Sequence, residues 1–353
     1  MGTIVTRKRG DGSPAYVAQI LLKRKGEIVH REAKTFDRKQ AAKAWLSRRE
    51  SELAKPGGLE KVEDPTLAAV IDRYIAESKK AIGRTKAQVL RTIKDYDIAD
   101  MKCSAIGSAE IVGFAQSLKV QPSTVQNYLS HLGAIFAVAK PAWKFPLDRQ
   151  AMKDAMVVTK RMGITAKSKG RDRRPSLDEL DKLMSHFGTV KKRRPRSGPM
   201  QKIVAFAIFS TRRQEEITTI KWADFDEAHS RVLVRDMKHP GDKEGNDTWC
   251  DLTPEAVRII KSMPKVREEI FPYSTDAIGA AFTRAGKVLG IDDLHFHDLR
   301  HDGISRLLEM GRTIPQVASV SGHRSWSSLQ RYTHLKQTGD KYQNWKWLAV
   351  VTA

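Results

Sequence analysis

Apolar side chains in the first part of the chain, residues 1–58, alternate with polar ones. This period of two, in segments rich in β-branched and aromatic residues, predicts strands at Ile4–Val5, Tyr16–Leu22 and Ile28–Phe36. A helix is expected next, with Asp37 capping its first turn and Gln40 as the capping-box partner. The block is therefore predicted to be a small three-stranded β-sheet with one helix.

The spacing becomes helical in the next block, residues 64–155. Apolar residues recur on one helical face in Thr66–Ile75, in the run that starts at Ser108, and in Ser123–Lys140. The block is predicted to be a helical domain. A basic connector, residues 156–174, follows it, and its lysines, arginines and glycines are typical of an extended linker.

Both patterns occur in the third block, residues 175–340. Ser176 and Glu179 have the capping-box spacing of a helix start. Alternating segments at Arg231–Val234 and Asp247–Leu252 predict a β-hairpin. The predicted fold class is thus multidomain α+β, with a sheet-plus-helix domain, a helical domain, and a mainly α domain that carries a small hairpin.

The last residues, 341–353, form an apolar and aromatic tail. It contains Tyr342, Trp345, Trp347, Leu348, Val350 and Val351. Such a tail can fold back on its own domain or dock on a neighbouring subunit, and we slightly favour docking.

Positive charge dominates the composition. The chain has 63 lysines and arginines against 41 acidic residues, a formal net charge of +22. Such a surplus favours polyanionic partners, although charge alone also fits an inert basic surface. The candidate DNA-contacting residues lie in the first block (Arg7, Lys8, Arg9), the helical block (Arg84, Lys86, Arg91) and the connector (Lys167, Lys169, Arg171, Arg173, Arg174).

Several classes of site are not expected. The two cysteines, Cys103 and Cys250, lie far apart, which predicts neither a disulfide framework nor a zinc cluster and favours a reducing compartment. The sequence lacks metal-binding and Gly-rich phosphate-binding motifs, so we expect no metal and no cofactor. It also lacks an apolar run of roughly eighteen residues, so no membrane segment is expected.

Arginine and histidine motifs lie in the third block. Arg213 is followed three residues later by Glu216 and nine residues later by Trp222. His297 and Arg300 form an HxxR pair, and positions i and i+3 share one helix face, so both side chains can converge on one phosphate.

A further histidine and a tyrosine complete the set. His323 follows Gly322, and Tyr332 stands nine residues later in the triplet Tyr-Thr-His. Together these motifs resemble the boxes of the tyrosine recombinases, in particular phage-type integrases and shufflon-type DNA invertases. The resemblance is strong over residues 175–340 and extends to the domain order of the chain. Thr211 and Arg212 stand where that family usually has glycine and an apolar residue, and we expect Arg212 to contact DNA outside the site.

The resemblance implies a mechanism. Tyr332 would attack a backbone phosphate, form a 3′-phosphotyrosyl bond and release a 5′-hydroxyl, without metal or ATP. Arg213 and Arg300 would hold the non-bridging oxygens with paired N–H donors, and Glu216 would support them. The remaining roles would be taken by His297 as acceptor of the phenolic proton, His323 as hydrogen-bond donor, and Lys238 as proton donor to the leaving oxygen.

The same resemblance implies double-stranded DNA as partner, through core sites and accessory arm sites. We expect a homotetramer on DNA, assistance from directionality or DNA-bending factors, and a cytoplasmic, nucleoid-associated protein encoded by a bacterial or phage mobile element. Residues 1–58 would be the arm-type domain, 64–155 the core-binding domain and 175–340 the catalytic domain. Two alternatives stay open: a type IB topoisomerase-like enzyme and a DNA-binding regulator without catalysis.

Overall fold

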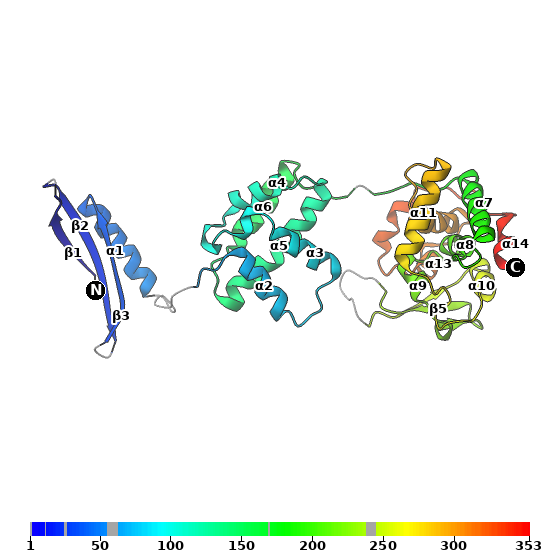
Figure 1. Ribbon diagram of the computed structural model, residues 1–353, viewed down its shortest axis with the longest axis horizontal. Helices are drawn as coiled ribbons and strands as arrows, with labels where there is room; N and C mark the ends of the chain where they lie inside the picture. Colours follow the sequence, from blue (N-terminus) through cyan, green and yellow to red (C-terminus); the bar gives the residue numbers. More distant parts are fainter. Residues whose placement is uncertain (1, 11, 25–26, 55–62, 169, 238–244) are drawn as a thin grey trace. The chain divides into compact units, whose positions relative to one another are not determined.

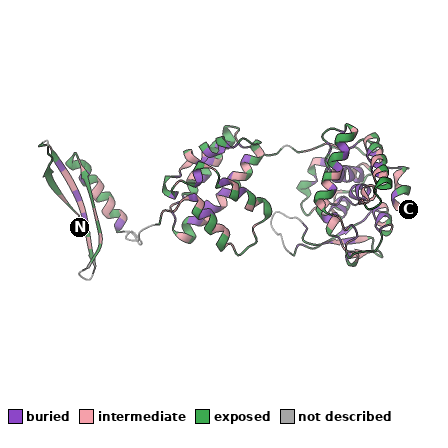
Figure 2. Cartoon of the chain, viewed as in Figure 1, coloured by how far each residue is buried: buried purple, intermediate pink, exposed green. Residues whose placement is uncertain are grey.

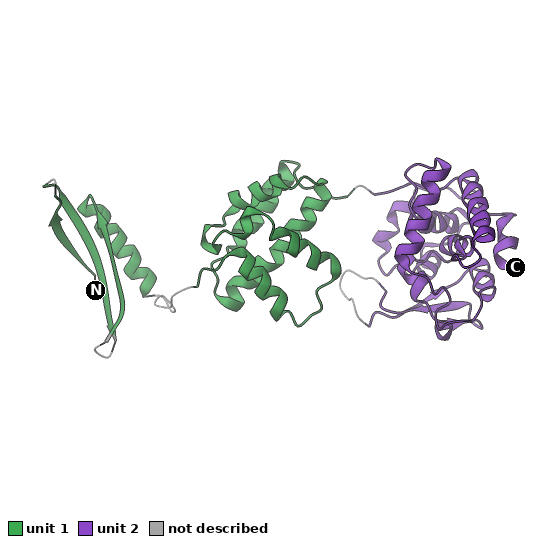
Figure 3. Cartoon of the chain, in the orientation of Figure 1, with its two compact units in different colours: residues 1–169 green, residues 170–353 purple. Residues whose placement is uncertain are grey.

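The computed structural model describes residues 2–10, 12–24, 27–54, 63–168, 170–237 and 245–353. The chain divides into two compact units, residues 1–169 and 170–353 (Figure 3). Lys169 and Lys238 lie outside the described residues.

A sheet with one helix forms the N-terminal part. Its antiparallel strands β1 (Gly2–Lys8), β2 (Pro14–Arg24) and β3 (Glu27–Phe36) lie in the order β1-β2-β3, and α1 (Lys39–Leu53) follows (Figure 1). Trp45 of α1 packs on Phe36, with ring centroids 5.8 Å apart. The expected cap is wrong: Arg38 is the N-cap residue and provides no side-chain cap, because the helix starts later than predicted and the Asp37 carboxylate pairs with Arg9.

A helical bundle makes up the rest of the first unit. It consists of α2 (Leu67–Glu77), α3 (Arg84–Ile93), α4 (Ser108–Ser117), α5 (Pro122–Trp143) and α6 (Arg149–Arg161). The core includes Leu67, Ile71, Leu90, Ile111, Leu129, Leu132, Ile135 and Phe136, which are all buried.

The predicted start of the linker, residue 156, is wrong. Helix α6 continues to Arg161, Ile164 packs against the bundle core, and the Ala166 N–H donates to the Pro122 carbonyl at 3.3 Å. Apolar side chains on α6 extend the bundle beyond residue 155, whereas the basic composition of this stretch predicts a linker.

The second unit is built around one buried helix, α8 (Met200–Ser210), whose residues from Ile203 to Ser210 are all buried (Figure 2). The other helices are α7 (Leu177–Arg193), α9 (Gln214–Thr219), α10 (Pro254–Lys261), α11 (Thr275–Leu289), α12 (Asp298–Glu309), α13 (Ile314–Ser321) and α14 (Trp347–Thr352). A small antiparallel sheet contains β4 (Phe225–Asp226), β5 (Arg231–Val234) and β6 (Thr248–Asp251), which confirms the predicted hairpin. The predicted capping box at Ser176 and Glu179 is also present.

Ion pairs with carboxylates that are distant in the sequence hold the first residues of the second unit in place. Arg171 pairs with the buried Asp298 at 2.9 Å, and Arg174 pairs with the buried Asp302 at 2.7 Å. Residues 171–174 are therefore part of the folded unit, although the sequence predicts an extended linker there.

The C-terminal tail packs on its own unit. Tyr342, Trp345 and Val351 are buried in the same core as α8, and the Tyr342 hydroxyl donates to Asp302. Docking on a neighbouring subunit, which we slightly favoured, is therefore not the arrangement of the tail in this structure. Aromatic side chains of the tail thus complete the core around α8.

Helices α8 and α12 approach each other closely at Gly303. A Cβ atom added there would lie 2.1 Å from the Ile208 carbonyl oxygen, which belongs to the backbone and cannot rotate away. The contact matters because α12 carries the HxxR motif and α8 leads to the first arginine motif.

We predict that Gly303→Ala destabilises the second unit, because the helices must separate to admit the methyl group. The free energy of unfolding should fall by about 1–3 kcal/mol, the usual cost of overpacking. Thermal or urea unfolding measures it. Gly286→Ala is the control, since its Cβ would meet the Ile291 carbonyl at an ordinary 3.4 Å. Equal stability of the two variants would contradict the close approach.

Candidate active site

The end of α8 turns sharply into the first arginine motif. Thr211 has φ +57°, a left-handed conformation that glycine adopts freely and β-branched residues rarely do. This explains why glycine is usual at the position in the family that the sequence resembles. The turn places Arg213 at the N-cap of α9, where its backbone N–H donates to Glu216 at 3.0 Å.

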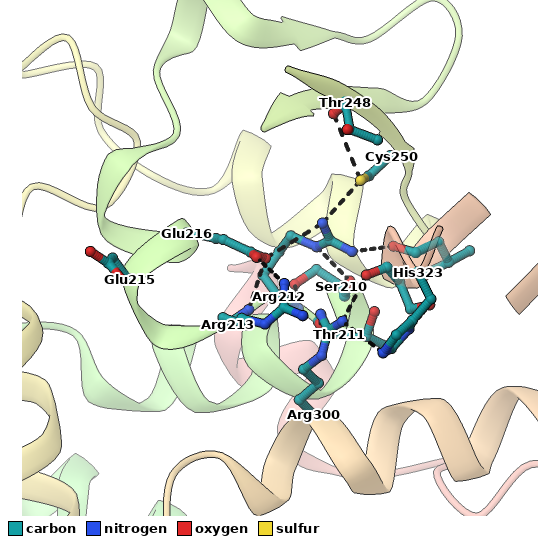
Figure 4. A network of polar contacts seen from close by, with 12 residues as sticks. Ser210, Thr211, Arg212, Arg213, Glu215, Glu216, Thr248, Cys250, Arg300 and His323 are labelled. Atoms are coloured by element: carbon teal, nitrogen blue, oxygen red, sulfur yellow. Dashed lines mark hydrogen bonds and ion pairs between the residues drawn. The ribbon is translucent and has the colours of Figure 1, made fainter. Parts of the chain in front are cut away.

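Glu216 organises the arginines around it (Figure 4). Its carboxylate pairs with Arg213 at 2.6 Å and with Arg212 at 3.6 Å. Burial would raise the pKa of Glu216, but the positive charges of Arg212, Arg300 and Arg213 outweigh burial and lower that pKa to about 2. These interactions stabilise the fold above the ordinary pKa of 4.5 and are lost as the pH falls through about 2.

Arg212 is fully buried and cannot contact DNA. Its guanidinium donates to the Ser210 carbonyl at 3.2 Å, to the Cys250 sulfur at 3.0 Å and to the Val320 carbonyl. The expectation that Arg212 binds DNA is therefore wrong. The sequence shows only an arginine, a residue type that is usually solvated, whereas the fold uses it to join α8, β6 and the end of α13.

Arg300 lies at the centre of the second motif and is also buried. It donates to the Thr211 carbonyl and, at 2.9 Å, to the Ser321 carbonyl. Burial and the neighbouring Arg212 and Arg213 lower the pKa of Arg300 to about 9, which still leaves it cationic at neutral pH.

His323 lies beside Arg300. Its Nε2 is 3.5 Å from the Arg300 guanidinium, and its Nδ1 is 2.7 Å from the Ser321 hydroxyl. Burial, together with the charges of Arg300 and Arg213, lowers the pKa of His323 to about 3. His323 is therefore neutral at physiological pH. The Arg300 guanidinium can only donate, so Nε2 accepts in their 3.5 Å hydrogen bond. In the other tautomer the Ser321 hydroxyl donates to Nδ1, and Nε2 carries the proton and can donate to a ligand.

His297 stands at the N-cap of α12 and is exposed. Partial desolvation, Arg300 and Arg213 lower its pKa. The charge of Arg300 therefore acts on His297, three residues earlier in the HxxR motif.

Tyr332 is buried, and its hydroxyl is hydrogen-bonded to Nδ1 of His301 rather than to His297. Burial raises the pKa of this phenol, while Arg331 and Arg300 act in the opposite direction. Sequence reasoning missed His301. The available signal was its spacing, because His301 stands one helical turn after His297 and directly after Arg300.

The segment that carries the tyrosine, Arg331–Tyr332, is hydrogen-bonded to residues 171–172. Arg331 donates to the Arg171 carbonyl and, at 2.6 Å, to the Asp172 carboxylate. Since Arg171 also pairs with Asp298, the start of the unit contacts both the HxxR helix and the tyrosine segment.

The candidate DNA-contacting residues differ in their surroundings. Exposed side chains include Arg7, Lys8, Arg84, Arg91 and Lys167. Arg9 pairs with Asp37, and Lys86 donates to the Tyr74 hydroxyl at 2.6 Å. The three connector arginines are held by carboxylates, with Arg173 bound to Glu179 at 2.5 Å alongside the pairs of Arg171 and Arg174. Charge in the sequence does not reveal these pairings.

The described part of the site brings together Arg213, Arg300 and His323 around a single acidic group, Glu216. Positive charge and N–H donors therefore exceed the carboxylate oxygens available to them, which is suited to binding an anion with several oxygens. In the described ranges, no group of three or more histidine, cysteine, aspartate or glutamate side chains is arranged to hold a metal ion. No helix among the described residues is long and apolar enough to span a membrane.

Residues 175–338 match the model of the phage integrase family. A curated relative, the shufflon-specific DNA recombinase of Escherichia coli, is 27% identical over 290 residues, which cover 78% of this chain and 71% of that protein. Relatives of this kind favour a recombinase over the topoisomerase and regulator alternatives.

Solved structures share the fold. The Tn1549 transposon integrase in complex with transposon right end DNA has a TM-score of 0.59 at 13% identity, over 76% of this chain and 94% of that one. A lambda integrase tetramer bound to a Holliday junction has a TM-score of 0.50 at 19% identity, over 91% of this chain and 95% of that one. With the motifs, the family match and these folds in agreement, residues 175–338 form a domain of the phage integrase family, and the chain is a tyrosine site-specific recombinase.

Proposed function

We propose that Tyr332 is the nucleophile of this recombinase and cuts DNA by forming a 3′-phosphotyrosyl bond. The phenolic oxygen bonds to phosphorus as the bond to the 5′-oxygen breaks, and the bond energy is kept for rejoining. A second 5′-hydroxyl then reverses the step on another strand. Neither ATP nor metal is needed in this scheme.

The observation that carries the proposal is the excess of buried positive charge around Glu216. Arg213 and Arg300 would hold the non-bridging oxygens, and the neutral His323 would donate through Nε2. Burial, followed by repulsion from Arg212 and Arg213, lowers the pKa of Arg300 to about 9, and a scissile phosphate would offset both effects. Because these donors are fixed before DNA binds, they need little reorganisation as charge develops in the transition state.

Two further residues complete the proposed site. His297, exposed one turn before His301, would contribute a hydrogen bond to the phosphate. Lys238 would protonate the departing 5′-oxygen, as the family resemblance implies. It follows strand β5 in the sequence.

The other domains would bind DNA around the cut. We propose that the helical bundle holds the core site and that the N-terminal sheet reads an accessory arm site, with Arg7, Lys8, Arg84, Arg91 and Lys167 among the phosphate contacts. The tetramer seen for lambda integrase supports a tetramer on DNA here as well. The phage and prophage integrases among the relatives support a mobile element of a bacterium or phage. The family resemblance further implies a cytoplasmic, nucleoid-associated protein and directionality or bending factors as partners.

We predict that Tyr332→Phe binds its core site like the wild type but forms no covalent complex, because only the nucleophilic oxygen is removed. A nicked suicide duplex on a denaturing gel measures this. Tyr273→Phe should cleave normally. Tyr342 cannot substitute, since burial and its bond to Asp302 raise its pKa well above 10. A covalent band from Tyr332→Phe would contradict the assignment.

The neighbouring arginines should give opposite phenotypes. Arg213→Ala should stay folded and slow cleavage by about 10²–10³-fold, as for loss of a preorganised donor. Arg212→Ala should instead lower the free energy of unfolding by about 3–5 kcal/mol, because it removes a buried charge beside Glu216 and the hydrogen bonds that join Ser210, Cys250 and Val320. Single-turnover cleavage and thermal unfolding distinguish them, with the exposed Arg258→Ala as control. A stable Arg212→Ala with weakened DNA binding would restore the original expectation.

Removing residues 1–58 should preserve cleavage of a short core site and impair recombination of a full-length site. Residues 1–58 contain fourteen basic and six acidic residues, so a formal charge of +8 is lost. Binding to long sites should weaken, and its dependence on salt should become shallower. Both activities are measured with equal amounts of folded protein. Full-length recombination at the wild-type rate would exclude an accessory-site role.

A further inference from the structure

The hydroxyl of Tyr332 has a specific partner in the protein. It is hydrogen-bonded to Nδ1 of His301, and the two rings lie with centroids 6.0 Å apart and tilted by 39°. His301 also packs edge-to-face on His297, at 4.9 Å and 89°. His301 of α12 thus contacts both the phenolic oxygen and the ring of His297, which stands one turn earlier.

We propose that His301 is the proton acceptor for the nucleophile Tyr332. This inference rests on the proposed function, in which the same phenol attacks the scissile phosphate. It reassigns to His301 the role that family resemblance gives to His297, and it leaves His297 to contact the phosphate.

The proposed step balances. The Tyr332 O–H bond breaks and its proton moves to Nδ1 of His301, while the phenolic oxygen bonds to phosphorus. The bond from phosphorus to the 5′-oxygen breaks, and that oxygen takes a proton from an acid, for which Lys238 is the candidate. In rejoining, the imidazolium returns its proton to the phenolic oxygen, so the cycle consumes no protons.

The surroundings keep His301 in the form that this step requires. Burial, followed by His297 and Arg331, lowers the pKa of His301 to about 4, so the ring is neutral and Nδ1 can accept when the ring proton is on Nε2. The charged groups that act on the pair are Asp298 and Arg300 of α12, Arg331 of the tyrosine segment, and Asp172 and Arg174.

The positively charged arginines near Tyr332 and His301 affect both side chains. Arg331 and Arg300 favour the phenolate of Tyr332, and they make His301 a weak base. A weak base cannot remove the proton in the resting protein. His301 accepts the proton only as the phenolic oxygen bonds to phosphorus, because the phenol then becomes acidic. Proton transfer is therefore limited to the complex in which a scissile phosphate is in place.

The test uses full-length protein and a nicked core-site duplex with sulfur in place of the scissile 5′-oxygen. A thiolate leaves without an acid, so the phenolic proton becomes the one whose transfer controls the rate. Formation of the covalent complex is followed in single turnover against pH for the wild type, His301→Gln, His301→Ala and Tyr332→Phe. His186→Gln on α7 is the matched control, and His301→Asn replaces His301→Gln if glutamine does not pack.

The wild-type rate should be flat from about pH 6 to pH 8, because neutral His301 is available throughout and Arg300, with a pKa of about 9, stays cationic. His301→Gln can accept the hydrogen bond but not the proton, so at pH 7 it should be slower by about 10²–10⁴-fold. Its rate should rise about tenfold per pH unit as hydroxide supplies the phenolate. Added imidazole should partly restore His301→Ala. A purely structural role would lower the melting temperature without this pH slope.

Contrary results have separate meanings. A folded His301→Gln with the wild-type rate and a flat profile would overturn the role of His301. Faster cleavage would also overturn it and make His301 a restraint on the tyrosine. A covalent complex with Tyr332→Phe would instead overturn the proposed function itself.

Discussion

The site depends on one buried carboxylate among guanidinium groups. Glu216 has three arginines around it, and each belongs to a different part of the unit: Arg212 to the turn after α8, Arg213 to the start of α9, and Arg300 to α12. Without the carboxylate these cations would repel one another in a medium of low dielectric constant. The ion pairs of Glu216 with Arg212 and Arg213 join the turn to α9, and hydrogen bonds from Arg212 to Cys250 and from Arg300 to Thr211 add strand β6 and α12.

The same arrangement leaves positive charge unbalanced. One carboxylate cannot neutralise three guanidinium groups, and the buried members cannot turn to solvent. Arg212 uses its donors on Ser210, Cys250 and Val320, whereas Arg213 remains partly exposed. The buried arginine thus fixes the scaffold, and the exposed one is left to meet an anion. The difference in burial between the adjacent Arg212 and Arg213 therefore gives the first a structural role and the second a role in binding an anion.

Sequence patterns predicted the local features well and the long-range ones poorly. The strands at Arg231–Val234 and the capping box at Ser176 depend on neighbours within a few residues, and both are present. By contrast, Arg171 finds Asp298 and Tyr332 finds His301 only through the tertiary fold. The order of the boxes identifies the family, but it does not reveal which arginine is buried or which histidine touches the phenol.

Strand cleavage as proposed requires Tyr332 to become covalently attached to DNA. Trypsin cleaves after Arg331 and Lys336, so the attached nucleotides should appear on the peptide Tyr332–Lys336. Mass spectrometry of the trapped complex, after nuclease and tryptic digestion, measures this directly. The account predicts a nucleotide adduct on Tyr332 of that peptide. An adduct on another peptide instead, such as Tyr342–Lys346, would contradict it.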